Sequence, residues 1–99
     1  MAVRKVTWTK RSIRQFNNAI EYIRKDSNQQ ADQVKAKILQ KILQLSDASV
    51  VHRADPYKKN NDGSYLYFEV LRYRIVYHAR KDEAMIIRIR HTSMEPRKY

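Results

Sequence analysis

The sequence predicts an α+β fold in which the elements follow the order β-α-α-β-β-β and an N-terminal helical hairpin covers one face of an antiparallel sheet. Two observations carry this prediction. Apolar residues recur at helical spacing in the first half of the chain, and residues 65–91 hold long runs of β-branched and aromatic residues. A length of 99 residues suits one modest core, so we expect a single domain over residues 1–99.

Charge is the most unusual property of the composition. The chain has 21 Lys and Arg against 10 Asp and Glu, a formal net charge of +11, which indicates a polyanionic or acidic partner. The absence of cysteine excludes disulfides and thiol catalysis, and no zinc spacing or Gly-rich phosphate loop occurs, so we expect no metal and no cofactor. Without a signal peptide or a run of about 18 apolar residues, the chain is expected to be cytoplasmic and without a membrane partner.

The first half of the chain predicts a strand and two helices. Residues 3–8 are β-rich and precede Thr9, a favourable N-cap for a helix over residues 10–25. Ser27 and Gln30 fit a capping box that begins a second helix over residues 28–45, and the short break between the helices predicts an antiparallel hairpin. The expected core stripes are Ile13, Phe16, Ile20 and Ile23, then Ala31, Val34, Ile38, Ile42 and Leu45. Leu39 and Leu43 widen the second stripe, either as a broad core face or as a groove for a partner helix.

The second half predicts a loop and three strands. Residues 47–64 carry the turn signals Asp55-Pro56 and Asn61-Asp62-Gly63 and are interpreted as a loop. Strands are expected over residues 65–71, 73–80 and 84–91, with a tight hairpin at residues 81–83.

Arginines recur at every second position of the last two strands. This alternation predicts a cationic face with Arg72, Arg74, Arg88 and Arg90 on one side of the sheet, and Ile75, Tyr77, Ile87 and Ile89 on the other. Arginine donates bidentate hydrogen bonds to phosphate and keeps its charge, so we favour a binding surface over an ordinary solvated face. The residues expected to bind nucleic acid are Arg72, Lys58, Arg88, Arg90 and Arg97.

The C-terminal tail holds the candidates for proton transfer. RNA cleavage needs a base for the 2′-hydroxyl, a cation at the phosphate and an acid for the leaving oxygen. His91, Arg74 and Tyr99 are the catalytic candidates. The alternative is that His91 is a capping or core histidine, since its parity places it on the core side, and that Tyr99 packs the C-terminus. Glu69 and Glu95 are interpreted as isolated carboxylates.

Several segments together resemble the RelE/ParE superfamily of toxins from bacterial type II toxin–antitoxin systems. The similar pieces are the opening VTWT, the two-helix hairpin, the strands RYRIVY and DEAMIIRIRH, and the tail HTSMEPRKY. The resemblance implies a small toxin that serves plasmid or chromosomal locus maintenance (a plasmid stabilisation protein) and is neutralised by a cognate antitoxin.

The superfamily implies two mechanisms. RelE-like members cleave mRNA in the ribosomal A site, with a phosphate-binding Arg at the position of Arg74 and a tail aromatic near Tyr99; ParE-like members poison DNA gyrase. The Glu base of some RelE-like nucleases has no counterpart here, and the tail is at least as similar to the ParE side. Our first expectation is growth arrest by metal-independent, ribosome-dependent mRNA cleavage. The alternatives are a non-nuclease gyrase inhibitor and a simple nucleic-acid-binding module.

Overall fold

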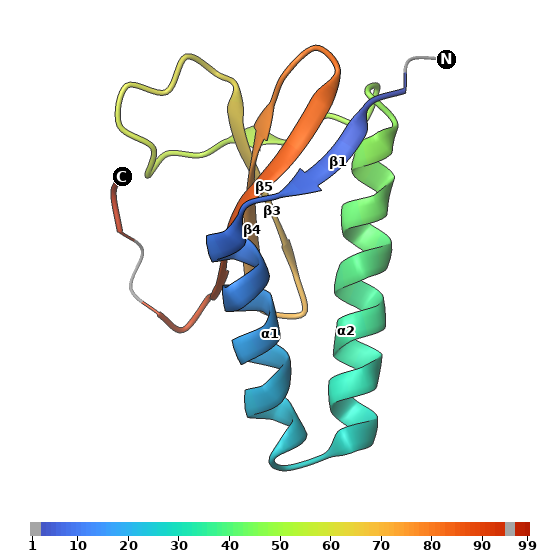
Figure 1. Cartoon of the computed structure of the whole chain (residues 1–99). Coiled ribbons are helices and arrows are strands. Elements are labelled where there is room, and N and C mark those ends of the chain that lie inside the picture. Colours follow the sequence, from blue (N-terminus) through green and yellow to red (C-terminus); the bar gives the residue numbers. More distant parts are fainter. Residues whose placement is uncertain (1–2, 95–96) are drawn as a thin grey trace.

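Two helices pack on one face of a five-stranded sheet in the computed structural model, which describes residues 3–94 and 97–99 (Figure 1). The predicted α+β class and its covering helical hairpin are confirmed. The elements are β1 (Lys5–Trp8), α1 (Lys10–Arg24), α2 (Asn28–Leu43), the 3₁₀ turn η1 (Gln44–Ser46), β2 (Arg53–Ala54), β3 (Tyr65–Val70), β4 (Tyr73–Ala79) and β5 (Glu83–His91).

Both helices begin at the predicted caps. The Thr9 hydroxyl accepts a hydrogen bond from the Ser12 N–H at 3.1 Å, and the Ser27 hydroxyl accepts one from the Gln30 N–H at 3.1 Å. The Ser27 N–H donates to the Ile23 carbonyl, so only half of the expected capping box forms in the described part of the chain. The second helix ends earlier than predicted, because the 3₁₀ turn η1 replaces its last residues.

The sheet has the order β1-β5-β4-β3-β2 and is mixed, whereas the sequence predicted antiparallel pairing throughout. Strand β1 runs parallel to β5, with Val6 opposite Ala84. Both helices and strands β2–β4 lie between β1 and β5 in the chain and supply the long connection that a parallel pair requires. Strand β2 is a short addition inside the segment predicted to be a loop, where Ala54 pairs with Leu66.

A two-residue turn joins β3 to β4 and corrects the predicted position of Arg72. Leu71 and Arg72 have φ values of 49° and 67°, the left-handed pair that tight hairpins use. Arg72 is therefore an exposed turn residue and not part of the cationic strand face. The turn escaped prediction because Leu-Arg lacks the Gly or Asn that normally marks such a turn.

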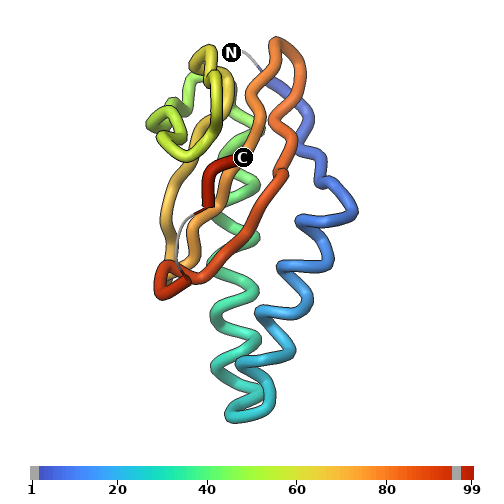
Figure 2. Tube along the Cα trace, turned by 90° about the vertical axis from the view of Figure 1, so that its left-hand side faces the viewer, coloured from blue at the N-terminus to red at the C-terminus, as the bar shows by residue number. Residues whose placement is uncertain are grey.

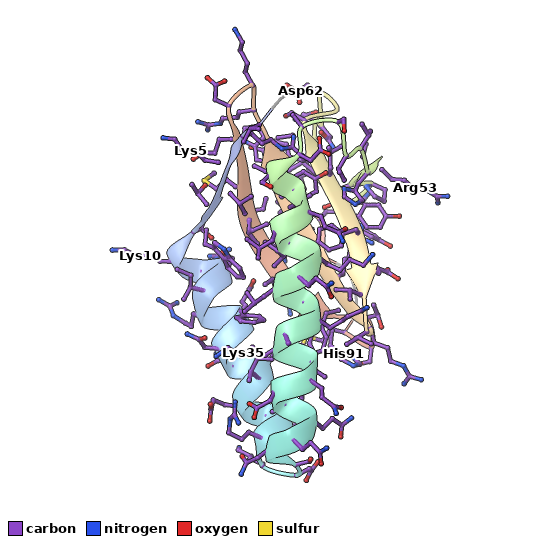
Figure 3. All side chains as sticks on the ribbon, turned by 90° about the vertical axis from the view of Figure 1, so that its right-hand side faces the viewer. Lys5, Lys10, Lys35, Arg53, Asp62 and His91 are labelled. Atoms are coloured by element: carbon purple, nitrogen blue, oxygen red, sulfur yellow. The ribbon has the colours of Figure 1, made fainter. Side chains whose placement is uncertain are left out.

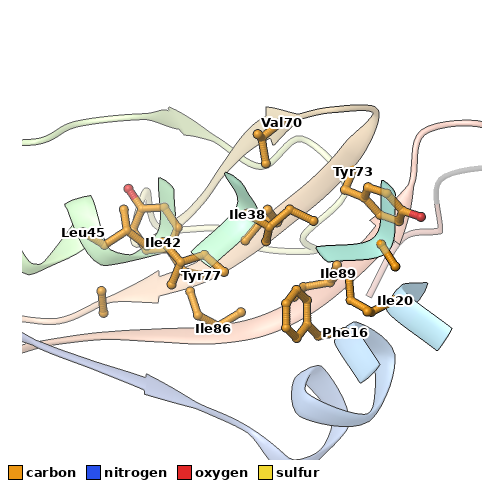
Figure 4. Packing of buried hydrophobic residues seen from close by; sticks show 13 residues of the cluster. Phe16, Ile20, Ile38, Ile42, Leu45, Val70, Tyr73, Tyr77, Ile86 and Ile89 are labelled. Carbon is orange, nitrogen blue, oxygen red and sulfur yellow. The ribbon is translucent and has the colours of Figure 1, made fainter. Parts of the chain in front are cut away.

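The core lies between the helices and the sheet (Figure 4). Its fully buried side chains include Ile38, Ile42 and Leu45 from the helical half and Ile75, Tyr77 and Ile86 from the sheet. Two predicted stripe positions lie outside it, because Ile13 and Leu43 are 45% and 65% exposed. In residues 3–94 and 97–99, no helix has the length and apolar character needed to cross a membrane.

Cations lie at both edges of the sheet (Figure 3). Lys5 and Lys10 lie on the β1 side, and Arg53 lies at the opposite edge on β2. Arg53 therefore lies at the edge of the sheet opposite to Lys5.

Candidate functional site

A β-bulge in β5 brings the arginines of β4 and β5 onto one face. Arg74 lies opposite Arg90, and Val76 lies opposite Arg88, but Tyr77 lies opposite Ile86, which leaves Ile87 as the extra residue. The bulge reverses the alternation of β5 at this point. Ile86 and Ile89 thus both face the helices, and Arg88 and Arg90 share the outer face, which is the sheet face turned away from the helices. The prediction that Ile87 faces the core was wrong for this reason.

Asp55, directly after β2, is the centre of a hydrogen-bond network on the outer face. Its side chain is only 1% exposed. One carboxylate oxygen accepts from Arg74 Nη2 at 2.7 Å and from the Tyr57 N–H at 3.1 Å; the other accepts from the Tyr99 hydroxyl at 2.7 Å. A buried carboxylate with these donors is fully engaged, as buried charges in proteins normally are.

The network fixes the protonation of its members. Burial would raise the pKa of Asp55, but the hydrogen bonds from Tyr99 and Arg74 outweigh it and hold that pKa below its usual value. Burial, followed by the hydrogen bond to Asp55, raises the pKa of Tyr99. The pair is therefore a carboxylate and a neutral phenol. A phenol whose proton is held by a carboxylate is a poor donor to a leaving group.

Arg74 is enclosed by carboxylates and rings. Its Nη1 lies 3.7 Å from Glu69, a carboxylate to which the sequence gave no role. Its guanidinium carbon lies 3.6 Å from the centroid of the Tyr67 ring and 4.9 Å from that of Tyr57. Arg74 therefore stabilises the fold as well as contributing charge. Glu95, the other predicted isolated carboxylate, lies outside the described residues.

The last described residues of the tail, 97–99, lie against the outer face (Figure 2). The Tyr99 N–H donates to the Tyr57 carbonyl at 3.0 Å, and the Lys59 N–H donates to the Tyr99 carbonyl at 2.6 Å. Arg88 stacks on the Tyr99 ring at 4.5 Å, and Lys58 lies 5.5 Å from the same ring. The expectation that Tyr99 packs the C-terminus is met, in that backbone and side chain together hold the tail on the sheet.

Six of the eight predicted site residues surround one hollow of about 120 Å³ beside the tail. They are Arg74, Arg88, Arg90, His91, Arg97 and Tyr99. Lys58 and Arg72 do not line it. Asp55, Tyr57 and Glu69 do, and sequence reasoning gave none of them a role. The only available signal was Asp55-Pro56, which was interpreted as a turn.

His91 lies at the end of β5, opposite the buried Tyr73, with the two rings edge to face at 5.1 Å. The parity prediction for His91 therefore holds. Its Nδ1 accepts from the Ser93 N–H at 3.0 Å and lies 2.7 Å from the Ser93 hydroxyl, so the neutral ring carries its proton on Nε2. In the described residues, no three His, Asp or Glu side chains cluster as a metal site would require.

Comparisons with known proteins agree with this architecture. A family model described as ParE toxin of type II toxin-antitoxin system, parDE, matches residues 6–96. A solved structure titled "Chromosomal ParDE TA system from P. aeruginosa" is similar in fold, with a TM-score of 0.72 at 12% identity over 92% of this chain and 98% of that one. No curated protein matches the chain. Because the family model spans nearly the whole sequence, the chain belongs to the ParE toxins of type II toxin–antitoxin systems.

Proposed function

We propose that this chain is a non-nuclease toxin that arrests growth by inhibiting DNA gyrase, and that a cognate antitoxin protein neutralises it in the cytoplasm. The sequence alone favoured mRNA cleavage and left gyrase inhibition as an alternative. The ParE family match supports it, since the resemblance that implied a toxin assigns gyrase to ParE-like members and mRNA to RelE-like members.

The observation that carries the proposal is that the candidate catalytic groups are already engaged. Arg74 and Tyr99 both bond to the buried Asp55, at 2.7 Å each. His91 Nδ1 accepts a hydrogen bond from the Ser93 N–H in the same turn. A ribonuclease needs a cation and proton-transfer groups directed at the substrate. Here Arg74 and Tyr99 are directed at Asp55, and His91 Nδ1 is bonded to Ser93, which favours a surface that binds a protein over a site that cleaves RNA.

Ribosome-dependent mRNA cleavage is the second candidate, and one observation favours it. Arg74, His91 and Tyr99 line the same hollow together with three further arginines. If substrate binding released Tyr99 from Asp55, a phenol and an imidazole would lie beside a cationic phosphate site. Such a rearrangement is needed for this second function and not for the first.

One induction experiment separates the two functions. The chain is expressed alone and together with its antitoxin, and plasmid topology and transcript ends are measured in the same cultures. Gyrase inhibition predicts loss of negative supercoiling with transcripts left whole, and reversal by the antitoxin. Ribosome-dependent cuts in mRNA with supercoiling unchanged would refute the proposal in favour of the nuclease.

A further inference from the structure

A second groove lies beside the end of the tail, and Asp55 is not among the residues that line it. It has a volume of about 480 Å³ and is lined by the start of α1, the bulge of β5 and the last residues of the tail. Its side chains include Arg11, Ile87, Arg88, Arg97, Lys98 and Tyr99. We call it the bulge groove. Lys98 and Arg11 belong to it although the sequence gave neither of them a role.

Among the described residues, those that line the bulge groove include four cationic side chains and no Asp or Glu. In the described part of the chain, none of the four forms an ion pair. Arg88 Nε is buried and has no hydrogen-bond partner among the described residues. Burial, and next the charge of Arg90, lowers the pKa of Arg88. Like charges held together without counterions favour an external polyanion.

The cations are held in place by the same features that build the outer face. The bulge turns Arg88 outward beside Val76 of β4. Arg88 Nη1 donates to the Arg97 carbonyl at 3.3 Å, and Tyr99 anchors the end of the tail on Asp55. The Asp55 network therefore also positions Arg97 and Lys98 over the groove.

The chemistry of the groove suits phosphates better than unpaired bases. Its aromatic side chain, Tyr99, has Arg88 over its ring at 4.5 Å and Lys58 at 5.5 Å. Single-stranded nucleic acid is normally bound by stacking its bases on aromatic rings. This ring is already occupied by cations, whereas guanidinium groups along an open groove match the backbone of a duplex.

We propose that the bulge groove binds the phosphate backbone of duplex DNA, so that the toxin contacts the DNA held by its target as well as the target protein. This inference rests on the proposed function, because gyrase works on duplex DNA. It adds a second ligand class to that function and assigns Arg11, Arg88, Arg97 and Lys98 to it.

The test is fluorescence anisotropy of the purified chain with a labelled duplex over 50–200 mM salt. Four phosphate contacts predict a slope of about −3.6 in log K against log salt, or about a 150-fold loss of affinity across this range. Each single variant that removes one contact should lower this loss of affinity to about 40-fold. These variants are Arg88→Ala, Arg97→Ala and Lys98→Ala. Arg88→Lys, which keeps the charge, should retain the full slope. Arg53→Ala is the matched control, because Arg53 lies at the opposite edge of the sheet (Figure 3).

The outcomes are distinct. The tail variants, Arg97→Ala and Lys98→Ala, decide the inference even if Arg88→Ala fails to fold. A salt slope in these variants equal to that of the wild type would overturn the inference. So would a change of the salt slope by Arg53→Ala as large as theirs. Tenfold preference for single-stranded RNA over duplex DNA would overturn it too, and would support the nuclease. A parallel supercoiling assay separates the two proposals. Inhibition of gyrase without DNA binding by the chain would refute DNA binding by the bulge groove and would still support the proposed function.

Discussion

Replacing Arg74 should destabilise the fold. A loss of toxicity in an Arg74 variant would therefore reflect lost stability as well as any lost function. The Arg74 side chain is 15% exposed and its partner Asp55 only 1%. Removing one member of a buried ion pair costs about 3–5 kcal/mol, because the other charge stays buried without its partner. Asp55 keeps the Tyr99 hydroxyl and the Tyr57 N–H, so the loss for Arg74→Gln should lie below that range.

We expect Arg74→Gln to reduce the free energy of unfolding by about 2–3 kcal/mol. For a chain of this size that corresponds to a melting temperature lower by roughly 10–20 °C. Urea denaturation of Arg74→Gln, Asp55→Asn and the double variant gives the interaction directly. The double variant should lose about 1–2 kcal/mol less than the sum of the single variants.

Arg72→Gln is the matched control, two residues away in an exposed turn, and should change stability by less than about 0.5 kcal/mol. A loss below about 1 kcal/mol for Arg74→Gln, or additive single variants, would show that the Asp55 network does not support the fold. In that case loss of toxicity in an Arg74 variant would indicate a direct role of Arg74 at the target, and the topology and transcript assays would identify that target.

Three further predictions follow from the packing. Tyr99→Phe removes a donor to a buried carboxylate and should cost about 1.5–3 kcal/mol, with faster amide exchange at Lys59; unchanged exchange would argue against an anchored tail. Ile38→Ala should cost about 2–5 kcal/mol in urea denaturation, because Ile38 is fully buried, and a smaller loss would indicate a looser helix–sheet contact. Burial, and then the charge of Arg4, lowers the pKa of His52, so the native state resists protonation and stability should fall as the pH drops below about 6.5. His52→Gln should reduce that loss between pH 7.5 and 5.5; an identical loss would assign it to other groups.

The sequence predicted the helices and the order of the main strands because those features depend on local patterns. Thr9 and Ser27 act as N-caps through their own hydroxyls, and apolar spacing alone marks the buried face of each helix. The parallel pairing of β1 with β5 depends on contacts about 80 residues apart in the chain. No local pattern encodes such a pairing.

Only part of the candidate site could be predicted, because the rest also depends on contacts between residues far apart in the chain. Alternation identified Arg74, Arg88 and Arg90, but regular alternation could not reveal the bulge that puts Arg88 and Arg90 beside Arg74. Asp55 was missed because its role depends on partners 19 and 44 residues away. A single Asp in a loop has no pattern that distinguishes a buried network centre from an ordinary turn.

Inhibition of gyrase by the purified chain can be measured directly. Relaxed plasmid, gyrase and ATP are incubated with increasing toxin, with and without the antitoxin, while a ribosome reaction with the same toxin is scored for transcript ends. We predict that supercoiling is lost in proportion to the toxin, is restored by the antitoxin, and that the transcripts stay intact. Full supercoiling at the highest toxin concentration, with transcripts cut at the ribosome, would show that the chain is a nuclease and not a gyrase inhibitor.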